Sequence, residues 1–200
     1  MASKIIVDQL QKSGYTALTL PSANATANQI LKNDGAGALS WSADAGAPPK
    51  IGQVLQATKT DTFTTTSASF TDITDLSIAI TPTSATSKIL VFMNVNGIGT
   101  TGGSGGFVKI VRDSTSIAIG DAAGSRPRAS NGAYDGDGGA SMPFSTVWID
   151  EPATTSAVTY KAQGHAKDAH TFYVNRTQAD GDTVGYSRTV STITVMEYLV

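Results

Sequence analysis

The two histidines of the chain, His165 and His170, are the side chains best suited to bind a transition metal. On one strand they would point to opposite faces, because their spacing of five is odd. If residues 166–169 form a hairpin loop, the two rings instead stand across from each other, and three copies of the chain could bring six imidazoles to an axis. No third type of ligand accompanies them, so we expect a polar hairpin tip and no metal.

Oxygen ligands occur together in residues 131–139, where Asn131, Asp135 and Asp137 faintly resemble a calcium-binding loop. The bidentate glutamate that such loops carry is missing. The Gly-rich stretch 97–106 suggests a phosphate loop, but it lacks the Gly-Lys-Ser/Thr ending and leads into a predicted strand. We therefore expect a solvated turn at the first place and a mobile strand connector at the second.

The sequence contains no recognisable catalytic motif. Neither the Gly-x-Ser-x-Gly nor the His-Glu-x-x-His pattern occurs. Asp150 and Glu151 are adjacent acids, but neighbours on a strand point to opposite faces. Glycoside hydrolysis needs two carboxylates that face each other across a cleft. We expect no enzymatic activity and no cofactor.

Arginine and tyrosine side chains in or near predicted loops are better candidates for function. Loops carry many of the binding residues of proteins, and Tyr and Arg are enriched where binding energy is concentrated. The candidates for contact with a receptor are Arg126, Arg128, Tyr134, Tyr173, Arg176, Tyr186 and Arg188. Ordinary loop packing, or contacts between subunits, would account for the same residues equally well.

The composition indicates a surface that is polar without being strongly charged. Charged residues make up 15% of the 200 residues, the net charge is −2 and there is no cysteine, whereas an average protein has about 25% charged residues. This excludes coiled coils, disulfide frameworks and a basic nucleic-acid-binding face. No apolar segment reaches the ~18 residues that a membrane span needs. The N-terminal residues lack a secretory signal pattern, so we expect synthesis in a cytoplasm without a signal peptide.

Residues 50–200 alternate between apolar and polar side chains, with turn signals between the runs. This pattern predicts about ten strands and no long helix, which is typical of an all-β, jelly-roll-like antiparallel sandwich. The strongest candidate for a central strand is 88–97. Residues 107–112 and 116–120 predict a hairpin around a turn at 113–115.

The chain closes with an apolar strand at residues 191–200. Because exposed apolar edges invite aggregation, we expect this strand to lie centrally in a sheet or between subunits. Residues 97–106 and 120–142 are predicted to be long Gly-rich loops, which are usually functional or disordered.

Residues 1–49 form a different region, with too few apolar residues to bury a core of their own. Either the region is a flexible tail, or it becomes ordered by wrapping around identical chains or docking on a larger assembly. Regular β patterning and a tryptophan favour the second alternative, and residues 44–49 then form a Pro-stiffened linker. The candidate attachment or stem residues are Ile5, Val7, Leu18, Leu20, Ile30, Leu31, Leu39 and Trp41.

Residues 18–41, LTLPSANATANQILKNDGAGALSW, resemble a segment of tail fibres and other appendages of tailed bacteriophages. In those proteins the segment links a virion attachment region to a distal domain. Residues 60–91, 120–126 and 191–197 resemble the distal domain of the same proteins. More loosely, the β-rich region is similar to the trimeric jelly rolls of the C1q and tumour-necrosis-factor type.

This resemblance implies a homotrimeric virion structural protein located on the phage tail or capsid surface and made in the host cytoplasm. Residues 1–49 would attach to other virion proteins or form a stem, and residues 50–200 would contact a glycan or protein of the host surface. A head fibre or capsid decoration protein of the same architecture is the alternative. Neither nucleic acid nor membrane insertion is expected.

Overall fold

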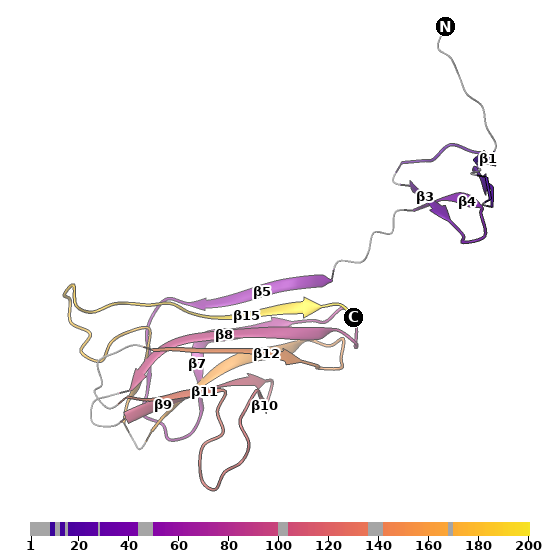
Figure 1. Cartoon of the computed structure of the whole chain (residues 1–200). Helices are drawn as coiled ribbons and strands as arrows, with labels where there is room; N and C mark the ends of the chain where they lie inside the picture. The colour runs from indigo at the N-terminus through magenta and orange to yellow at the C-terminus, as the bar shows by residue number, and fades with distance from the viewer. Residues whose placement is uncertain are drawn as a thin grey trace. The chain divides into compact units, whose positions relative to one another are not determined.

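The computed structural model describes residues 9–10, 13–14, 16–27, 29–43, 50–99, 104–135, 142–167 and 170–200. Strands, turns and irregular segments make up these residues, and no helix occurs among them (Figure 1). The chain divides into two compact units, Met1–Pro49 and Lys50–Val200.

Two pairs of short antiparallel strands build the smaller unit. β1 (Gln9–Leu10) pairs with β2 (Leu18–Thr19), and β3 (Gln29–Asn33) pairs with β4 (Leu39–Ala43). The carboxylate of Asp34 closes the turn after β3, because it accepts hydrogen bonds from the backbone N–H groups at positions 36 and 38. None of the described side chains of this unit is buried, so these residues enclose no core.

Two antiparallel sheets build the larger unit, and the core lies between them. The strands of the first, which we call the β8 sheet, are β5 (Ile51–Lys59), β6 (Phe63–Thr65), β8 (Lys88–Gly99), β12 (Met142–Asp150), β14 (Phe172–Val174) and β15 (Ser191–Tyr198). The strands of the second, the β9 sheet, are β7 (Thr71–Ile80), β9 (Ser104–Arg112), β10 (Thr115–Ile117), β11 (Asn131–Asp135) and β13 (Val158–Ala166).

The strand orders are β5-β15-β8-β14-β6 in the β8 sheet and β10-β9-β13-β7 in the β9 sheet. In addition, β12 pairs with β8, and β11 pairs with β9. Figure 1 shows β5, β15, β8 and β12 running side by side across one layer. The predicted fold class, an all-β jelly-roll-like antiparallel sandwich, is confirmed.

Alternation of side chains along each strand decides which residues enter the core. In β8 the odd-numbered residues from Ile89 to Val95 are buried, and the even-numbered residues face away from the other sheet. β15 repeats the pattern, with Ile193 and Val195 buried. The closing strand lies between β5 and β8, so its predicted central position is confirmed. The predicted hairpin is also present, as β9 and β10 pair across a turn at Asp113.

The predicted Gly-rich loop 97–106 is strand in its described residues, whereas the predicted loop 120–142 is a loop over residues 120–130 and contains one strand, β11. β8 continues to Gly99 and β9 begins at Ser104, and β11 lies within the predicted loop 120–142. The glycines of the first stretch make room for the buried ring of Phe172. A Cβ at Gly97 would lie 2.6 Å from Cζ of Phe172, and a Cβ at Gly106 would clash with the same ring. These glycines therefore serve close packing rather than loop mobility.

Glu197 is a fully buried carboxylate on the inner face of β15. Its Oε1 accepts hydrogen bonds from the backbone N–H and the hydroxyl of Thr83, at 2.6 and 2.8 Å, and its Oε2 accepts one from Gln53 Nε2 at 2.9 Å. Burial acts to raise the pKa of Glu197, but the hydrogen bonds, above all those from Thr83, outweigh burial and lower it. The folded chain therefore favours the charged form of this side chain.

Because folding lowers the pKa of Glu197, its ionised form contributes stability that is present above the ordinary value of 4.5 and is lost as the pH falls through the folded value. We expect Glu197→Gln to lower the free energy of unfolding by about 1–3 kcal/mol at pH 7 and by less at pH 3, as measured by denaturant titration. Glu151→Gln is the matched control, since Glu151 is exposed and pairs with Lys88 at the surface. Equal losses for Glu197→Gln at both pH values would contradict this account.

Candidate functional site

Four of the seven predicted contact residues lie around one loop. Residues 175–190, which we call the C-terminal loop, connect β14 to β15 and project from one end of the sandwich (Figure 1). Tyr173 lies in the strand just before this loop, and Arg176, Tyr186 and Arg188 belong to it. Residues that are up to 15 positions apart in the sequence are thus gathered into one candidate site.

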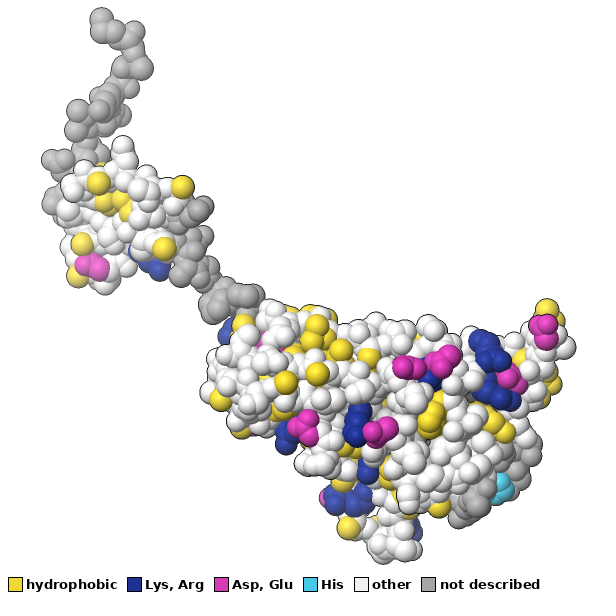
Figure 2. Space-filling view, turned by 180° about the vertical axis from the view of Figure 1, so that it is seen from behind, with side chains coloured by type: hydrophobic (Ala, Val, Ile, Leu, Met, Phe, Trp, Pro, Cys, Tyr) yellow, Lys and Arg dark blue, Asp and Glu magenta, His cyan; other side chains and the backbone are white. Residues whose placement is uncertain are grey.

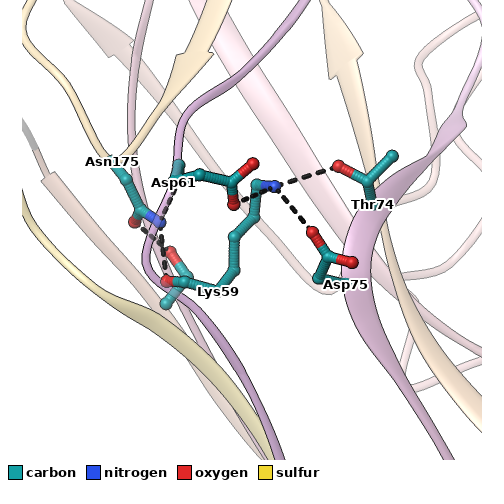
Figure 3. Close-up of polar contacts among 6 residues, drawn as sticks. Lys59, Asp61, Thr74, Asp75 and Asn175 are labelled. Carbon is teal, nitrogen blue, oxygen red and sulfur yellow. Dashed lines mark hydrogen bonds and ion pairs between the residues drawn. The ribbon is translucent and has the colours of Figure 1, made fainter.

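The C-terminal loop starts at Asn175, a fully buried residue with a left-handed backbone conformation of φ 61°. Its Nδ2 donates to the backbone carbonyl oxygens of Lys59 and Asp61, at 2.9 and 3.0 Å, as Figure 3 shows. Its Oδ1 accepts a hydrogen bond from the hydroxyl of Ser191 at 2.7 Å, and its backbone N–H donates to the carbonyl of Asn96 at 2.8 Å. One amide side chain therefore ties both ends of the loop to the sheet.

Lys59 joins the two sheets beside this amide. Its side chain is fully buried, and Nζ donates to Asp61 Oδ1 at 2.7 Å, Thr74 Oγ1 at 2.9 Å and Asp75 Oδ2 at 3.4 Å (Figure 3). The hydrogen bond from Lys59 lowers the pKa of Asp61. A buried ammonium is tolerated only when it is paired and hydrogen-bonded. All three donors of Lys59 are used in this way, so its role is structural.

Asp180 organises the two arginines of the C-terminal loop. Arg188 Nη2 lies 2.8 Å from both carboxylate oxygens of Asp180, and Arg176 Nη1 lies 3.4 Å from Oδ2. Arg176 also donates to two backbone carbonyls of its own loop, and its guanidinium lies 4.7 Å from the centre of the Tyr173 ring. Arg176 thus stabilises the loop, whereas 59% of the Arg188 side chain remains exposed.

A small cavity of about 260 Å³ lies within the C-terminal loop, bounded by Tyr186, Arg188 and the carboxylates of Asp180 and Asp182. Tyr186 is 45% exposed. An exposed aromatic ring can pack against the apolar face of a sugar, while carboxylates accept hydrogen bonds from its hydroxyls. The arrangement suits a polar, largely uncharged ligand such as a neutral glycan.

Arg128 lies at a second and larger cavity of about 570 Å³, over the outer face of the β9 sheet. Lys109 and His165 line it from the paired strands β9 and β13, and Phe70 lines it from the turn before β7. Arg128 Nε donates to the carbonyl of Gly120 at 2.6 Å, which holds the side chain against its own loop. Neither Phe70 nor Lys109 is a candidate from the sequence, because nothing in the local pattern distinguishes either residue from those around it.

Of the two other contact candidates, Arg126 lines neither cavity. Arg126 is exposed on the loop between β10 and β11. Tyr134 lies in β11, and the structure does not describe its side chain.

The structure does not bear out the hairpin suggested for the two histidines. β13, which contains His165, pairs within the β9 sheet, whereas β14, which follows His170, pairs within the β8 sheet. The chain therefore crosses from one sheet to the other at this point. The His165 ring is buried, with ring centres of Phe70 and Phe107 at 5.0 and 5.4 Å, and burial lowers its pKa.

The suggested calcium loop begins as a strand instead of a turn. Asn131 starts β11, and its Nδ2 donates to the carbonyl of Ser145 at 2.9 Å. Asp135 ends β11, with a side chain that the structure does not describe, and Asp137 lies outside the described residues. Among the described residues, no three His, Cys, Asp or Glu side chains form a group that could hold a metal ion.

Asp150 and Glu151 point apart, as predicted for neighbours on a strand. Asp150 is buried, and its Oδ2 accepts hydrogen bonds from Tyr160 Oη at 2.6 Å and Arg112 Nη1 at 2.7 Å. Burial and the hydrogen bond to Asp150 raise the pKa of Tyr160. Glu151 is exposed and pairs with Lys88 at 2.7 Å. The two carboxylates therefore share no cleft.

The stem candidates lie on both faces of the β3–β4 hairpin and beside it. Leu31 pairs with Trp41, and Leu39 shares their face, whereas Ile30 lies on the opposite face. The indole N–H of Trp41 donates to the carbonyl of Ala23 at 2.7 Å. Leu18 and Leu20 are half-buried next to these strands. Two further candidates lie outside the described residues, namely Ile5 and Val7.

Charged side chains on the larger unit occur as small mixed groups. Figure 2 shows this on one face, where Lys and Arg lie next to Asp and Glu and hydrophobic side chains gather toward one end. Lys161 and Asp72 form one such pair, at 2.7 Å. Among the residues that the structure describes, there is no helix that could span a membrane.

Comparisons with known proteins give weak likenesses. No family model matches the chain, and no curated protein is significantly similar to it. The chain is 12% identical, with a TM-score of 0.36, to a chain in the crystal structure of the infectious bursal disease virus VP2 subviral particle. It is 14% identical, with a TM-score of 0.34, to a chain in the structure of the Gx strain of that virus. Each match covers 94% of this chain and 50% of the other, so this chain spans about half their length.

Asn175 offers a direct test of how the C-terminal loop is held. We expect Asn175→Gly, which keeps the left-handed backbone but removes the amide, to lower the free energy of unfolding by about 2–3 kcal/mol. Asn175→Ala should cost about 1 kcal/mol more, because alanine is strained at positive φ. Both variants should be cleaved faster within residues 176–190 in limited proteolysis. Asn94→Ala is the control, since Asn94 only accepts an exposed hydrogen bond from Ser145. Unchanged proteolysis of the loop would contradict this account.

Proposed function

We propose that the chain is a bacteriophage virion structural protein, a homotrimeric tail fibre or related appendage whose C-terminal sandwich contacts the host cell surface. The observation that carries this proposal is that the smaller unit buries none of its described side chains. Leu10, Ile30 and Leu31 are 52%, 38% and 43% exposed. Ordered strands with uncovered apolar residues require a partner, and residues 18–41 are the segment that resembles phage appendages.

The outer face of the β8 sheet gives independent support for association between copies. Strand register aligns Val54, Met196, Leu90 and Ile149 in one row that crosses four neighbouring strands. Val54 and Ile149 are 56% and 55% exposed at the two ends of this row. Every side chain of the row is apolar, so exposure of the row to water is unfavourable.

The row on one side of this apolar row favours a second copy of the chain over a charged partner, and on the other side Lys88 is paired with Glu151. The next row contains Gln56, Thr194, Phe92 and Val147, and none of these side chains is charged. A stable interface buries about 800 Å² on each partner, for which a sheet face of four strands is a suitable area. Cyclic symmetry would cover this face with identical chains, and we take three copies from the jelly-roll resemblance.

The C-terminal loop is the part of the larger unit that we assign to host contact. It combines the exposed ring of Tyr186 with the carboxylates of Asp180 and Asp182 beside a small cavity. The buried Asn175 fixes the base of the loop, which lowers the ordering cost of binding. Three such loops in one trimer would add weak contacts into avidity. A head fibre or capsid decoration protein is the second candidate, and the same uncovered stem residues favour it equally.

The proposed trimer interface can be tested with one matched pair of variants. Light scattering should give the mass of three chains for the natural protein, and of one chain for Val54→Lys, because three desolvated ammonium groups would meet at the interface. Thr58→Lys adds the same charge on the same strand and face, but in a polar row, and should remain trimeric. A trimer for Val54→Lys would show that this face is not the interface.

Host contact predicts that the purified protein competes with phage particles for adsorption. We expect the full chain to reduce adsorption in a dose-dependent way, and Tyr186→Ala to lose most of this effect without a change in unfolding midpoint. Val184→Ala, which alters an exposed residue of the same loop that does not line the cavity, should compete like the natural protein. Immunolabelling of particles would separate tail from head. Labelled heads together with no competition would favour the decoration protein over the adhesin.

A further inference from the structure

The cavity over the β9 sheet has the size and lining of a binding site. Its volume of about 570 Å³ falls within the range of small-molecule pockets, about 300–1,000 Å³. Lys109 and Arg128 supply two positive charges, and no Asp or Glu lies among the lining residues. Ser69 and Ser116 add hydroxyl groups, and Ile119 and Pro127 add apolar surface.

The positive charge of this cavity is not neutralised by the nearby acid on β7. Asp72 is occupied by Lys161 and Gln163, at 2.7 and 2.6 Å. Lys109 Nζ instead lies 4.3 Å from the ring centre of Phe70, and burial lowers its pKa. Arg128 uses its Nε on the carbonyl of Gly120, which leaves its Nη groups without a protein partner among the described residues.

His165 is the titratable residue that lines the cavity from β13. The residue is only 7% exposed and lines the cavity. Its Nδ1 has no hydrogen-bond partner in the part of the chain that the structure describes. An unpaired buried polar atom is unfavourable, and buried polar groups are usually satisfied by protein, water or a ligand. Because Nδ1 is itself buried, a ligand in the cavity would lie against the ring and change its surroundings rather than bond to this atom.

We propose that this cavity binds an acidic sugar, whose carboxylate or phosphate lies between Lys109 and Arg128 and whose ring lies against Ile119 and Pro127. Two cations match one anionic group, and the net charge of −2 disfavours a long polyanion. The inference rests on the proposed function for its biological meaning, since it names the class of host-surface group. It concerns a site separate from the C-terminal loop.

The test is a titration of the full-length protein followed by NMR of the imidazole carbon-bound protons. The chain has two histidines, so His170 gives an internal reference, and a His170→Gln variant assigns the two signals. The probes are glucuronate, glucose 6-phosphate, glucose and inorganic phosphate at equal ionic strength. We expect at least one of the two sugar anions to shift the His165 signals with a dissociation constant of about 1 mM, and to shift those of His170 far less.

Matched variants identify the cations. Arg128→Gln and Lys109→Met should each weaken binding of the sugar anion by about tenfold or more, because each removes a charge-assisted contact. Arg126→Gln changes the same charge on the same loop, but Arg126 is not among the lining residues, so binding should be unchanged. Unfolding midpoints of all three variants check that the fold is retained.

Three results would overturn the inference. Unshifted His165 signals with both sugar anions would exclude the site, and equal binding of glucose would exclude a role for the cations. Equal binding of inorganic phosphate would make it a simple anion site. Glucuronate and glucose 6-phosphate separate a carboxylate from a phosphate ester. No cells or particles enter this experiment, so its failure is distinguishable from failure of the adsorption test.

Discussion

The buried amide of Asn175 is the interaction on which the sandwich and its main candidate loop both depend. A buried polar group is costly unless its hydrogen bonds are made, and Asn175 makes them where the end of β5, β8 and the start of β15 meet. There its side chain satisfies two backbone carbonyls and the hydroxyl of Ser191. The C-terminal loop projects from this point, with both of its ends held by the one side chain.

Two buried charged side chains of the sandwich are satisfied by hydrogen bonds in the same way. Lys59 bridges the two sheets through Thr74 and Asp75, and Glu197 collects hydrogen bonds from Thr83 and Gln53. Each of these charges is paired or hydrogen-bonded, so its removal would leave partners unsatisfied. A chain with few charged residues thus places several of them inside, where they fix the register of strands. This leaves broad surfaces of threonine, serine and alanine, together with the apolar row of the β8 sheet.

Local patterns were sufficient to predict the strands but not the sites. Alternation in β8 and β15 predicts their buried faces, because the period of two is a property of each strand alone. The prediction of a loop at residues 97–106 was wrong. The glycines there make room for the ring of Phe172, a residue far along the sequence that packs on Gly97 and Gly106. The second cavity escaped notice for a similar reason. It forms where the paired strands β9 and β13 bring Lys109 and His165 to one face, and no single-strand pattern contains that pairing.

The two faces of the sandwich have different chemistry, and this difference makes the proposals compatible. The outer face of the β8 sheet is apolar and uncharged along the row from Val54 to Ile149, whereas the outer face of the β9 sheet carries Lys109 and the large cavity. A trimer that covers the first face leaves the second open, because the two faces lie on opposite sides of one core. Each copy would then present one C-terminal loop and one cationic cavity to solvent. Three weak sites on a rigid base are enough for firm attachment to a repetitive surface, since linked sites multiply affinity without any new contact.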